Sequence, residues 1–268
     1  MIDNNQQKLL RQKYNPDYSP LRIHQMKMLK MLSFFDKICK DNGIKYWLSS
    51  GTCLGAVRHG GFIPWDDDMD VEMLREDYLK LEKVFQETDQ YVFQTYKNDK
   101  YYGIVFAKMR DKRTCIYDSL YKYKGVFIDV FCLEHTPRFL SKMAEAYRRF
   151  TIDFLYDFLK KHRNRRLLFL IISFLYVSLK YIYFVSLPIF RFAGFFVPHK
   201  KLRHCYGVGW ADNYREEADI SPLKSIEFEG MVFPVPGNYD KYLSKIYGNY
   251  MSIPDENDIP KAHAQFLK

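Results

Sequence analysis

The sequence contains no Cys-x-x-Cys pair, no low-complexity tract and no internal repeat. Its five cysteines are odd in number and widely spaced, which argues against a disulfide framework and a structural zinc site. The segment MIDNNQQKLL lacks the apolar run of a signal peptide, so we expect a cytosolic protein with buried, reduced thiols. The cysteines in question are Cys39, Cys53, Cys115, Cys132 and Cys205.

Negative charge is in the minority, since 32 acidic residues stand against 41 Lys and Arg, for a net charge of +9. A basic protein attracts polyanions such as nucleotides, nucleic acid or an anionic membrane, and charge alone does not choose among them. No nucleic-acid-binding motif accompanies the charge, so we expect no nucleic-acid partner. Hydrophobic residues reach 47% and aromatic residues 18%, which suits a packed fold and excludes a disordered chain.

Strand-like and helix-like segments alternate along the chain and predict an α+β fold, a mixed sheet flanked by helices with a helical apolar insertion. Four regions follow: an irregular N-terminal arm at 1–20, a core at 21–137, the insertion at 138–205 and a C-terminal segment at 206–268 that completes the core. Strands are expected at 44–48, 68–73, 91–96, 104–109 and 125–133, a hairpin at 226–233, and helices at 21–40, 76–86 and 239–247.

The acidic run Asp66-Asp67-Asp68-Met69-Asp70 is the main candidate for chemistry. On a strand, Asp68 and Asp70 project from one face while Met69 enters the core. Two adjacent carboxylates repel each other unless a cation lies between them, and oxygen ligands favour Mg²⁺ or Mn²⁺. A third carboxylate is expected from Asp129, the single charge in the apolar strand GVFIDVF, whether one metal is bound or two.

Other interpretations of the acidic run are weaker. An acidic run is usually a solvated loop, but here Trp65 precedes it and an apolar-alternating strand follows. The DDxxD pattern of prenyl diphosphate synthases belongs on long helices in two copies, whereas this run follows Pro64 and has no second copy. The spaced ligands and terminal Glu of an EF-hand loop are also missing.

A small-residue turn, Ser50-Gly51-Thr52, lies between a predicted strand and a helix opening at Leu54. Small residues let backbone N–H groups approach a phosphate at the start of a helix, where the dipole favours negative charge. Donor-binding candidates beyond the turn are Arg58, Trp65, Lys108 and Arg110, each of which is as readily a structural or surface residue.

These motifs together resemble the LicD family, which has a nucleotidyltransferase fold and is related to fukutin-related proteins. The resemblance rests on YWLSSGTCLGAVRHGGFIPWDDDMD at 46–70, on GVFIDVF at 125–131, and more weakly on FEG, PVP, NY and YG between 228 and 248. It implies transfer of a phosphorylated alcohol, most often phosphocholine, from CDP-choline or another CDP-alcohol to a hydroxyl of a teichoic acid, capsule or lipid-linked glycan, with release of CMP.

The resemblance also implies roles for individual residues. Asp68, Asp70 and Asp129 would hold Mg²⁺ with Asp66 beside them, and the turn at 50–52 would lie against the donor diphosphate. Either Asp129 or Asp66 would accept the proton of the attacking hydroxyl. Relatives often carry Gly-Gly-Thr in the turn, where this chain has Ser50-Gly51-Thr52; serine is small and donates a hydrogen bond, so activity is still expected.

Residues 167–197 are the least polar part of the chain, with Lys160–Arg166 before them and Lys200, Lys201 and Arg203 after them. Positive flanks on both sides argue against a single crossing, because they favour both ends on the cytoplasmic side. We expect two apolar helices, broken near Pro188, on the inner surface of the cell membrane, with a buried helical subdomain as the alternative.

Two further functions stay open at the level of sequence. The same fold also serves enzymes that move a nucleotide to a small molecule and release pyrophosphate. A non-catalytic, membrane-bound glycan-binding scaffold is the third possibility, although all three expected metal-binding carboxylates are present. A choline pocket would need aromatic faces, for which Tyr46, Trp65, Tyr101, Tyr102 and Trp210 are candidates.

Overall fold

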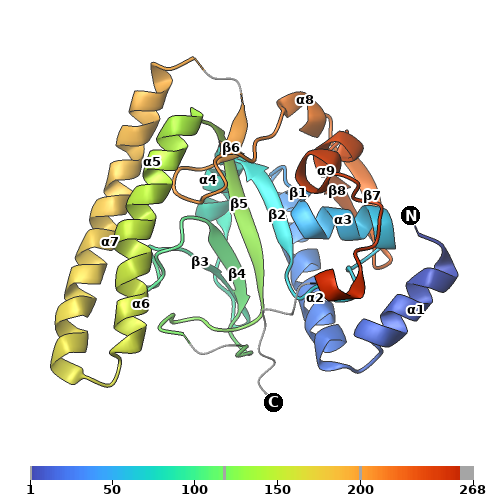
Figure 1. Cartoon of the computed structure of the whole chain (residues 1–268), viewed down its shortest axis with the longest axis horizontal. Helices are drawn as coiled ribbons and strands as arrows, with labels where there is room; N and C mark the ends of the chain where they lie inside the picture. Colours follow the sequence, from blue (N-terminus) through green and yellow to red (C-terminus); the bar gives the residue numbers. More distant parts are fainter. Residues whose placement is uncertain (1, 117–118, 199–200, 260–268) are drawn as a thin grey trace.

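A computed structural model describes residues 2–116, 119–198 and 201–259, and shows a mixed sheet with helical layers on both sides (Figure 1). The sheet order is β1-β2-β5-β4-β3, with β6 pairing on β5. Only β2 and β5 run parallel among these pairs. The strands are β1 (Trp47–Leu48), β2 (Asp70–Leu74), β3 (Tyr91–Gln94), β4 (Ala107–Asp111), β5 (Phe127–His135) and β6 (Leu202–His204). The predicted α+β class is confirmed.

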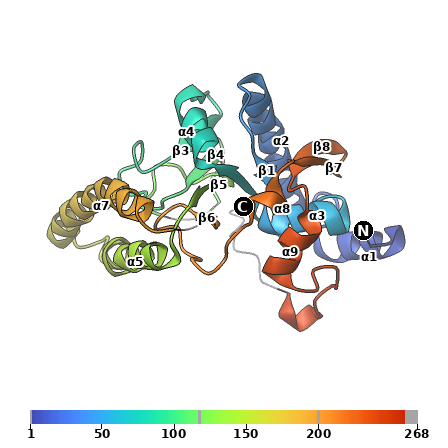
Figure 2. The same cartoon turned by 90° about the horizontal axis from the view of Figure 1, so that it is seen from above.

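Helices cover the sheet from two sides, as the view from above shows (Figure 2). One group contains α1 (Asn4–Tyr14), α2 (Pro20–Asp41), α3 (Ser50–His59), α8 (Glu217–Ile220) and α9 (Tyr239–Tyr247), together with the hairpin of β7 (Lys224–Phe228) and β8 (Met231–Val235). The other side carries α5 (Arg138–Arg148), a π-helical turn at 149–153, α6 (Phe154–Lys161) and α7 (Arg166–Phe195), while α4 (Arg75–Val84) follows β2.

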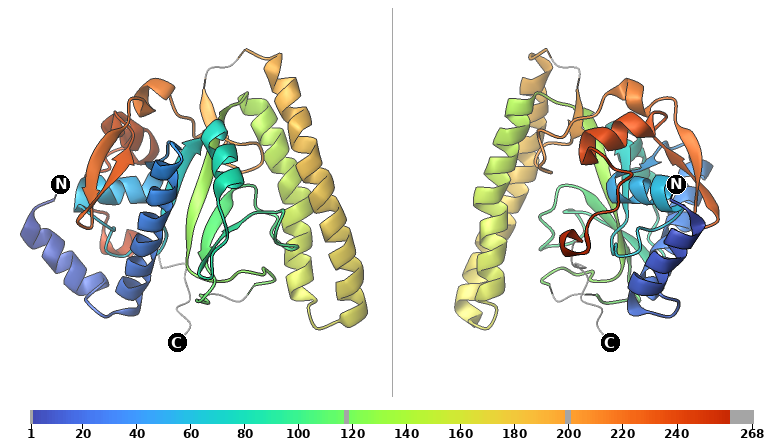
Figure 3. Two further views of the ribbon diagram at one scale, coloured as in Figure 1. Left: turned by 180° about the vertical axis from the view of Figure 1, so that it is seen from behind. Right: turned by 45° about the vertical axis from the view of Figure 1, so that its right-hand side comes forward.

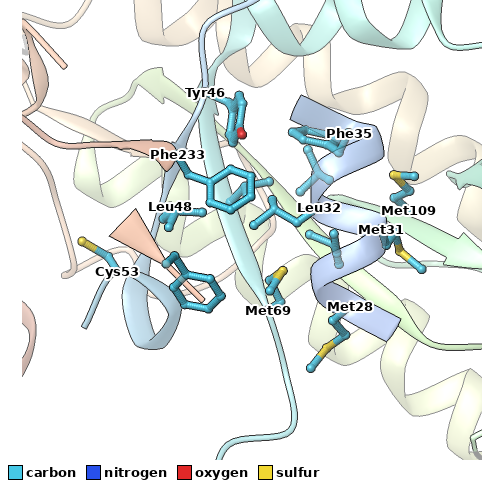
Figure 4. Packing of buried hydrophobic residues seen from close by; sticks show 14 of the residues in the cluster. Met28, Met31, Leu32, Phe35, Tyr46, Leu48, Cys53, Met69, Met109 and Phe233 are labelled. Carbon is cyan, nitrogen blue, oxygen red and sulfur yellow. The ribbon is translucent and has the colours of Figure 1, made fainter. Parts of the chain in front are cut away.

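The core lies between α2 and one face of the sheet (Figure 4). Ser19 caps α2 by accepting from the Arg22 N–H, Pro20 supplies the fixed φ of the first helical turn, and Gly43, at φ +60°, follows the helix end. Apolar side chains at helical spacing then meet the inward residues of the strands. The buried set includes Met28, Met31, Leu32, Phe35, Leu48, Met69, Met109 and Phe233.

Because side chains alternate along β2 and β5, apolar residues lie on one face of the sheet and carboxylates on the other. Val71 and Val130 point into the core with α2, whereas Asp70 and Asp129 belong to the opposite set. The polar face of the sheet is therefore free of α2, and it is where the candidate site lies.

Three predictions about the fold are wrong. Residues 4–14 form α1 rather than an irregular arm, because Asp3 accepts hydrogen bonds from the N–H groups of Asn5 and Gln6. The apolar segment is not broken near Pro188, because it forms one continuous helix of 30 residues, α7. The helices beside α7 come from residues 138–161. Cys132 and Cys205 form a disulfide between β5 and the residue after β6, so not every thiol is reduced.

Candidate active site

The predicted carboxylates meet at the start of the two parallel strands. Asp70 is the first residue of β2 and lies in register with Asp129 on β5. Neighbouring strands are about 4.8 Å apart, so these side chains share one face at close range. Asp66 and Asp68 lie in the segment before β2, because β2 begins at Asp70, two residues later than the predicted start at 68. The acidic loop is fixed from α2, where Gln25 Nε2 donates to the Asp66 carbonyl at 2.8 Å.

Electrostatics within this carboxylate cluster are unfavourable without a cation. Burial, and then the charge of Asp68, raise the pKa of Asp66, and the Asp66 and Asp68 side chains hydrogen-bond to each other. Burial, followed by Asp68, Asp129 and Asp66, raises the pKa of Asp70 well above its ordinary value. Carboxylates crowded in this way either retain a proton or bind a cation.

Lys108 supplies the positive charge nearest to the cluster. Its Nζ forms an ion pair with Asp129 and lies 3.6 Å from the centroid of the Phe127 ring. Burial lowers the pKa of Lys108, and Asp129 opposes that effect. Across the described residues, no three His, Cys, Asp or Glu side chains already surround a common metal position. The all-oxygen donor set nevertheless suits Mg²⁺ or Mn²⁺, provided that Asp129 turns from Lys108 toward the ion.

The small-residue turn is the first turn of α3, which begins at Ser50 rather than at Leu54. Ser49, at its N-cap, is fully buried, and its Oγ has no hydrogen-bond partner within the described residues. A Cβ added to Gly51 would lie 3.0 Å from Asp66 Oδ2, so this backbone closely approaches the cluster. A helix N-terminus whose backbone lies this close to the carboxylates suits a phosphate bridged by a metal ion.

Thr52 has a positioning role in the structure. Its Oγ1 accepts a hydrogen bond from the Asp70 N–H at 2.8 Å, which ties α3 to the first residue of β2. Ser50 is held from the other side, because its N–H donates to the Tyr242 hydroxyl of α9 at 3.2 Å. The C-terminal segment thus fixes the turn against the cluster.

A buried polar network beneath the cluster was not predicted from the sequence. The fully buried Glu72 accepts from Arg215 at 2.9 Å and from the Tyr242 hydroxyl and the Trp47 indole at 3.0 Å each, with His204 Nε2 at 3.4 Å. Burial alone would raise the pKa of Glu72, but Arg215 and His204 lower it to about 2. The only sequence signal was the third polar position in DMDVEM; its partners come from distant segments.

Three predicted donor-binding residues have other partners in the structure. Arg58 lies at the far end of α3, where it donates to the carbonyls of Tyr250 and Ser252. Arg110 is fully buried and donates to the Gln94 side chain and the Gly125 carbonyl. Trp65 packs edge-on against Tyr14 of α1. Arg58 and Trp65 have structural surroundings, since proximity in sequence to the acidic run does not fix the direction of a side chain. Arg110 lies on the same face of β4 as Lys108, but its guanidinium is bound to its buried partners.

Aromatic residues line the polar face next to the carboxylates. Phe131 follows Asp129 by two residues on the same face of β5 and contacts Phe106, with ring centroids 4.4 Å apart. Trp210 is 58% exposed and lies 6.0 Å from Phe131, centroid to centroid. On the other side is Tyr247 of α9, whose pKa is raised by burial and by the charges of Asp70, Asp66 and Asp68.

Trp210 is the candidate choline-pocket aromatic that is both exposed and joined to this face. Tyr46 is buried in the core and donates to Asp36, while Tyr102 is buried with its hydroxyl on the Phe106 carbonyl. Tyr101 packs on α7 through Tyr176. A hollow of about 990 Å³ opens beside Trp210, between the α5–α6 helices and residues 210–213.

Comparison with known proteins identifies the family of this chain. Residues 43–173 match the family described as LicD/FKTN/FKRP, nucleotidyltransferase domain. Lipopolysaccharide cholinephosphotransferase LicD of Haemophilus influenzae is 31% identical over 261 residues, which cover 91% of this chain and 96% of that protein. The chain belongs to the LicD family.

More distant relatives of this LicD-family protein match over shorter segments. Ribitol-5-phosphate transferase FKTN of Mus musculus is 39% identical over 56 residues, 21% of this chain and 12% of that protein. Ribitol 5-phosphate transferase FKRP of Homo sapiens is 48% identical over 42 residues, 16% of this chain and 8% of that protein. These shares are too small to carry a conclusion about the whole chain.

Proposed function

We propose that the protein is a magnesium-dependent phosphotransferase that moves phosphocholine from CDP-choline to a hydroxyl of a cell-surface glycan or its lipid-linked precursor. The observation that carries the proposal is the convergence of Asp66, Asp68, Asp70 and Asp129 beside the N-terminus of α3. The similarity to the Haemophilus influenzae cholinephosphotransferase over nearly the whole of both chains supports the choice of phosphocholine.

The donor diphosphate is assigned to the space between α3 and the carboxylates. There the N–H groups of Gly51 and Thr52, in the first turn of α3, would contact phosphate oxygens. A divalent ion bound by Asp68, Asp70 and Asp129 would neutralise the diphosphate and polarise the phosphorus under attack. Lys108, released from Asp129, would then pair with a phosphate oxygen.

The reaction breaks one P–O bond and forms another. The acceptor hydroxyl oxygen bonds to the phosphorus that carries choline, the diphosphate P–O bond breaks, and CMP leaves with the bonding electron pair. The hydroxyl proton goes to a carboxylate, and we assign Asp66, which lies beside Asp68 and Asp70, because Asp129 is assigned to the metal. Positioning and charge stabilisation supply most of the rate enhancement in such a site.

The choline group is assigned to the aromatic side chains next to the cluster. A quaternary ammonium binds to the faces of aromatic rings, and Trp210 presents an exposed ring beside Phe131, two residues along β5 from Asp129. The glycan is assigned to the hollow that begins at Trp210, since aromatic and acidic side chains, among them Phe150 and Glu145, line it.

The test is the release of CMP from CDP-choline with Mg²⁺ and a glycan acceptor. Release that depends on the acceptor and disappears in Asp70→Asn supports the proposal. Release of CMP only with CDP-ribitol or CDP-glycerol would support the same reaction with a different transferred alcohol phosphate. Pyrophosphate formation from a nucleoside triphosphate would instead identify a nucleotidyltransferase. If the folded protein processes none of these donors, the enzymatic proposal is wrong.

A further inference from the structure

One side of α7 exposes a continuous row of large apolar side chains. Spacings of three, four and eight residues place the row on a single face of the helix. Each member is 56% to 77% exposed, and α7 forms the outer edge of the molecule (Figure 3). We call this row the outer face of α7; it contains Leu170, Phe174, Ile182, Val185, Ile189 and Phe192. Soluble proteins seldom expose so long an apolar strip without a partner.

The opposite side of α7 is fixed to the domain, which excludes a transmembrane orientation. Lys180, in the middle of the helix, is fully buried and donates to the carbonyls of Tyr96, Asp99 and Lys100, each at 3.0 Å. Tyr176 donates to the Tyr101 carbonyl at 2.7 Å. The helix is long and apolar enough to cross a bilayer, but a crossing would break these contacts and leave polar groups in hydrocarbon.

Charge identifies the surface that the outer face of α7 suits. No Asp or Glu occurs between Asp157 and Asp212, and the tip between α6 and α7 exposes a basic cluster. That cluster consists of Lys160, Lys161, Arg163, Arg165 and Arg166. Basic residues beside an apolar helical face are the composition of helices that lie in an anionic leaflet.

A second copy of the chain fits the outer face of α7 less well than an anionic leaflet does. Lys201 and Arg203 follow the other end of α7, but Lys201 is paired with Glu216 and Arg203 is buried, so the exposed cations of this region gather at the basic tip. Parallel pairing of two α7 helices would therefore bring the two basic tips together. Lys200, also expected to flank the segment, lies outside the described residues.

We propose that the outer face of α7 lies in the plane of an anionic membrane leaflet, with the basic tip at the lipid headgroups. The helix spans about 45 Å, which gives one extended contact along the bilayer surface. This inference does not depend on the cargo. If the proposed function is also correct, the sheet and its carboxylates lie beside the membrane that carries a lipid-linked acceptor.

The experiment measures binding of the full chain to vesicles of phosphatidylcholine with or without phosphatidylglycerol. The test variant is Phe174→Glu with Val185→Glu. The matched control is Leu9→Glu with Val232→Glu, which adds the same charge at apolar positions that are 66% and 58% exposed on α1 and β8. We expect wild type and control to bind the anionic vesicles, and the test variant to bind at least about tenfold more weakly.

A second measurement detects insertion of the outer face of α7 into lipid directly, instead of a loss of vesicle binding. A tryptophan placed by Phe174→Trp is expected to be quenched by lipids brominated on their acyl chains, whereas one placed by Leu9→Trp is not. Equal vesicle binding by the test variant and the control, or an unquenched Phe174→Trp, would overturn the inference. So would a lipid-free dimer that only the Phe174→Glu, Val185→Glu variant dissociates, because a second copy would then be the occupant. CMP release on a soluble acceptor tests the proposed function separately.

Discussion

Two regions of this chain depart from the usual distribution of polarity in opposite directions. At the carboxylate cluster, acidic side chains gather on a partly enclosed face of the sheet; on α7, large apolar side chains face outward. The first departure is partly compensated inside the molecule, since Lys108 pairs with Asp129. The second has no such compensation among the described residues. A carboxylate cluster that one lysine balances only in part suits a bound cation and chemistry, whereas an apolar face left exposed suits docking.

The largest expected effect concerns the carboxylate cluster. Replacing Asp70 by Asn removes a charge that the proposed metal site needs, while the hydrogen bond from its N–H to Thr52 is retained. We expect CMP release to fall by about a thousandfold or more, with thermal unfolding little changed. The control is Glu76→Gln on the exposed first turn of α4. Comparable losses in both variants would show that charge near the sheet, not this cluster, controls the rate.

The next effect concerns the network that supports the cluster. Glu72→Gln leaves Arg215 buried without its counter-charge, so we expect the free energy of unfolding to fall by about 3 kcal/mol. Denaturant titration measures it. The pKa of Glu72 in the folded protein, about 2, lies below its ordinary value of 4.5. Its stabilising contribution is therefore complete above pH 4.5 and is lost as the pH falls toward 2.

The same variant gives a test by pH. Between pH 4.5 and pH 2 the wild type is expected to lose stability more steeply than Glu72→Gln, because the variant has no carboxyl group to titrate at this position. Parallel curves over this interval would contradict the assigned role of Glu72, whatever the size of the difference at neutral pH.

A smaller effect is expected for cargo selection. Trp210→Ala removes the exposed ring next to Phe131, so the KM for CDP-choline should rise about tenfold with little change in kcat. CDP-ribitol, which has no quaternary ammonium, should be affected less. Tyr18→Ala, at an aromatic position that is 91% exposed, is the control. An equal rise in KM for both donors would remove Trp210 from choline recognition and assign it a general binding role.

The sequence predicted the parts of the fold that depend on local pattern. Alternation identified β2 and β5, and it selected Asp70 and Asp129 before their register was known. It did not find Arg215 and Tyr242, because their contacts with Glu72 cross 143 and 170 residues of chain. Arg58 was also expected to bind the donor phosphate, but the structure places Arg58 at the other end of α3.

The apolar insertion is a second case in which the sequence predicted the type of segment but not its contacts. Pro188 predicted a break, yet side chains such as Phe184 and Leu187, buried on the inner side of α7, keep the helix continuous through the loss of one backbone donor. Composition indicated an apolar helical segment correctly. The contacts of Lys180 and Tyr176 show which side faces the protein and which side is exposed.

The measurement that tests the central claim most directly is calorimetric titration of Mn²⁺ into the wild type, Asp70→Asn and Glu76→Gln. The claim is that the carboxylates at the start of β2 and β5 form a divalent-cation site, which Asp129 completes when it leaves Lys108. We predict saturable binding in the wild type and in Glu76→Gln, and at least about tenfold weaker binding in Asp70→Asn. Equal affinity in all three proteins would contradict the account.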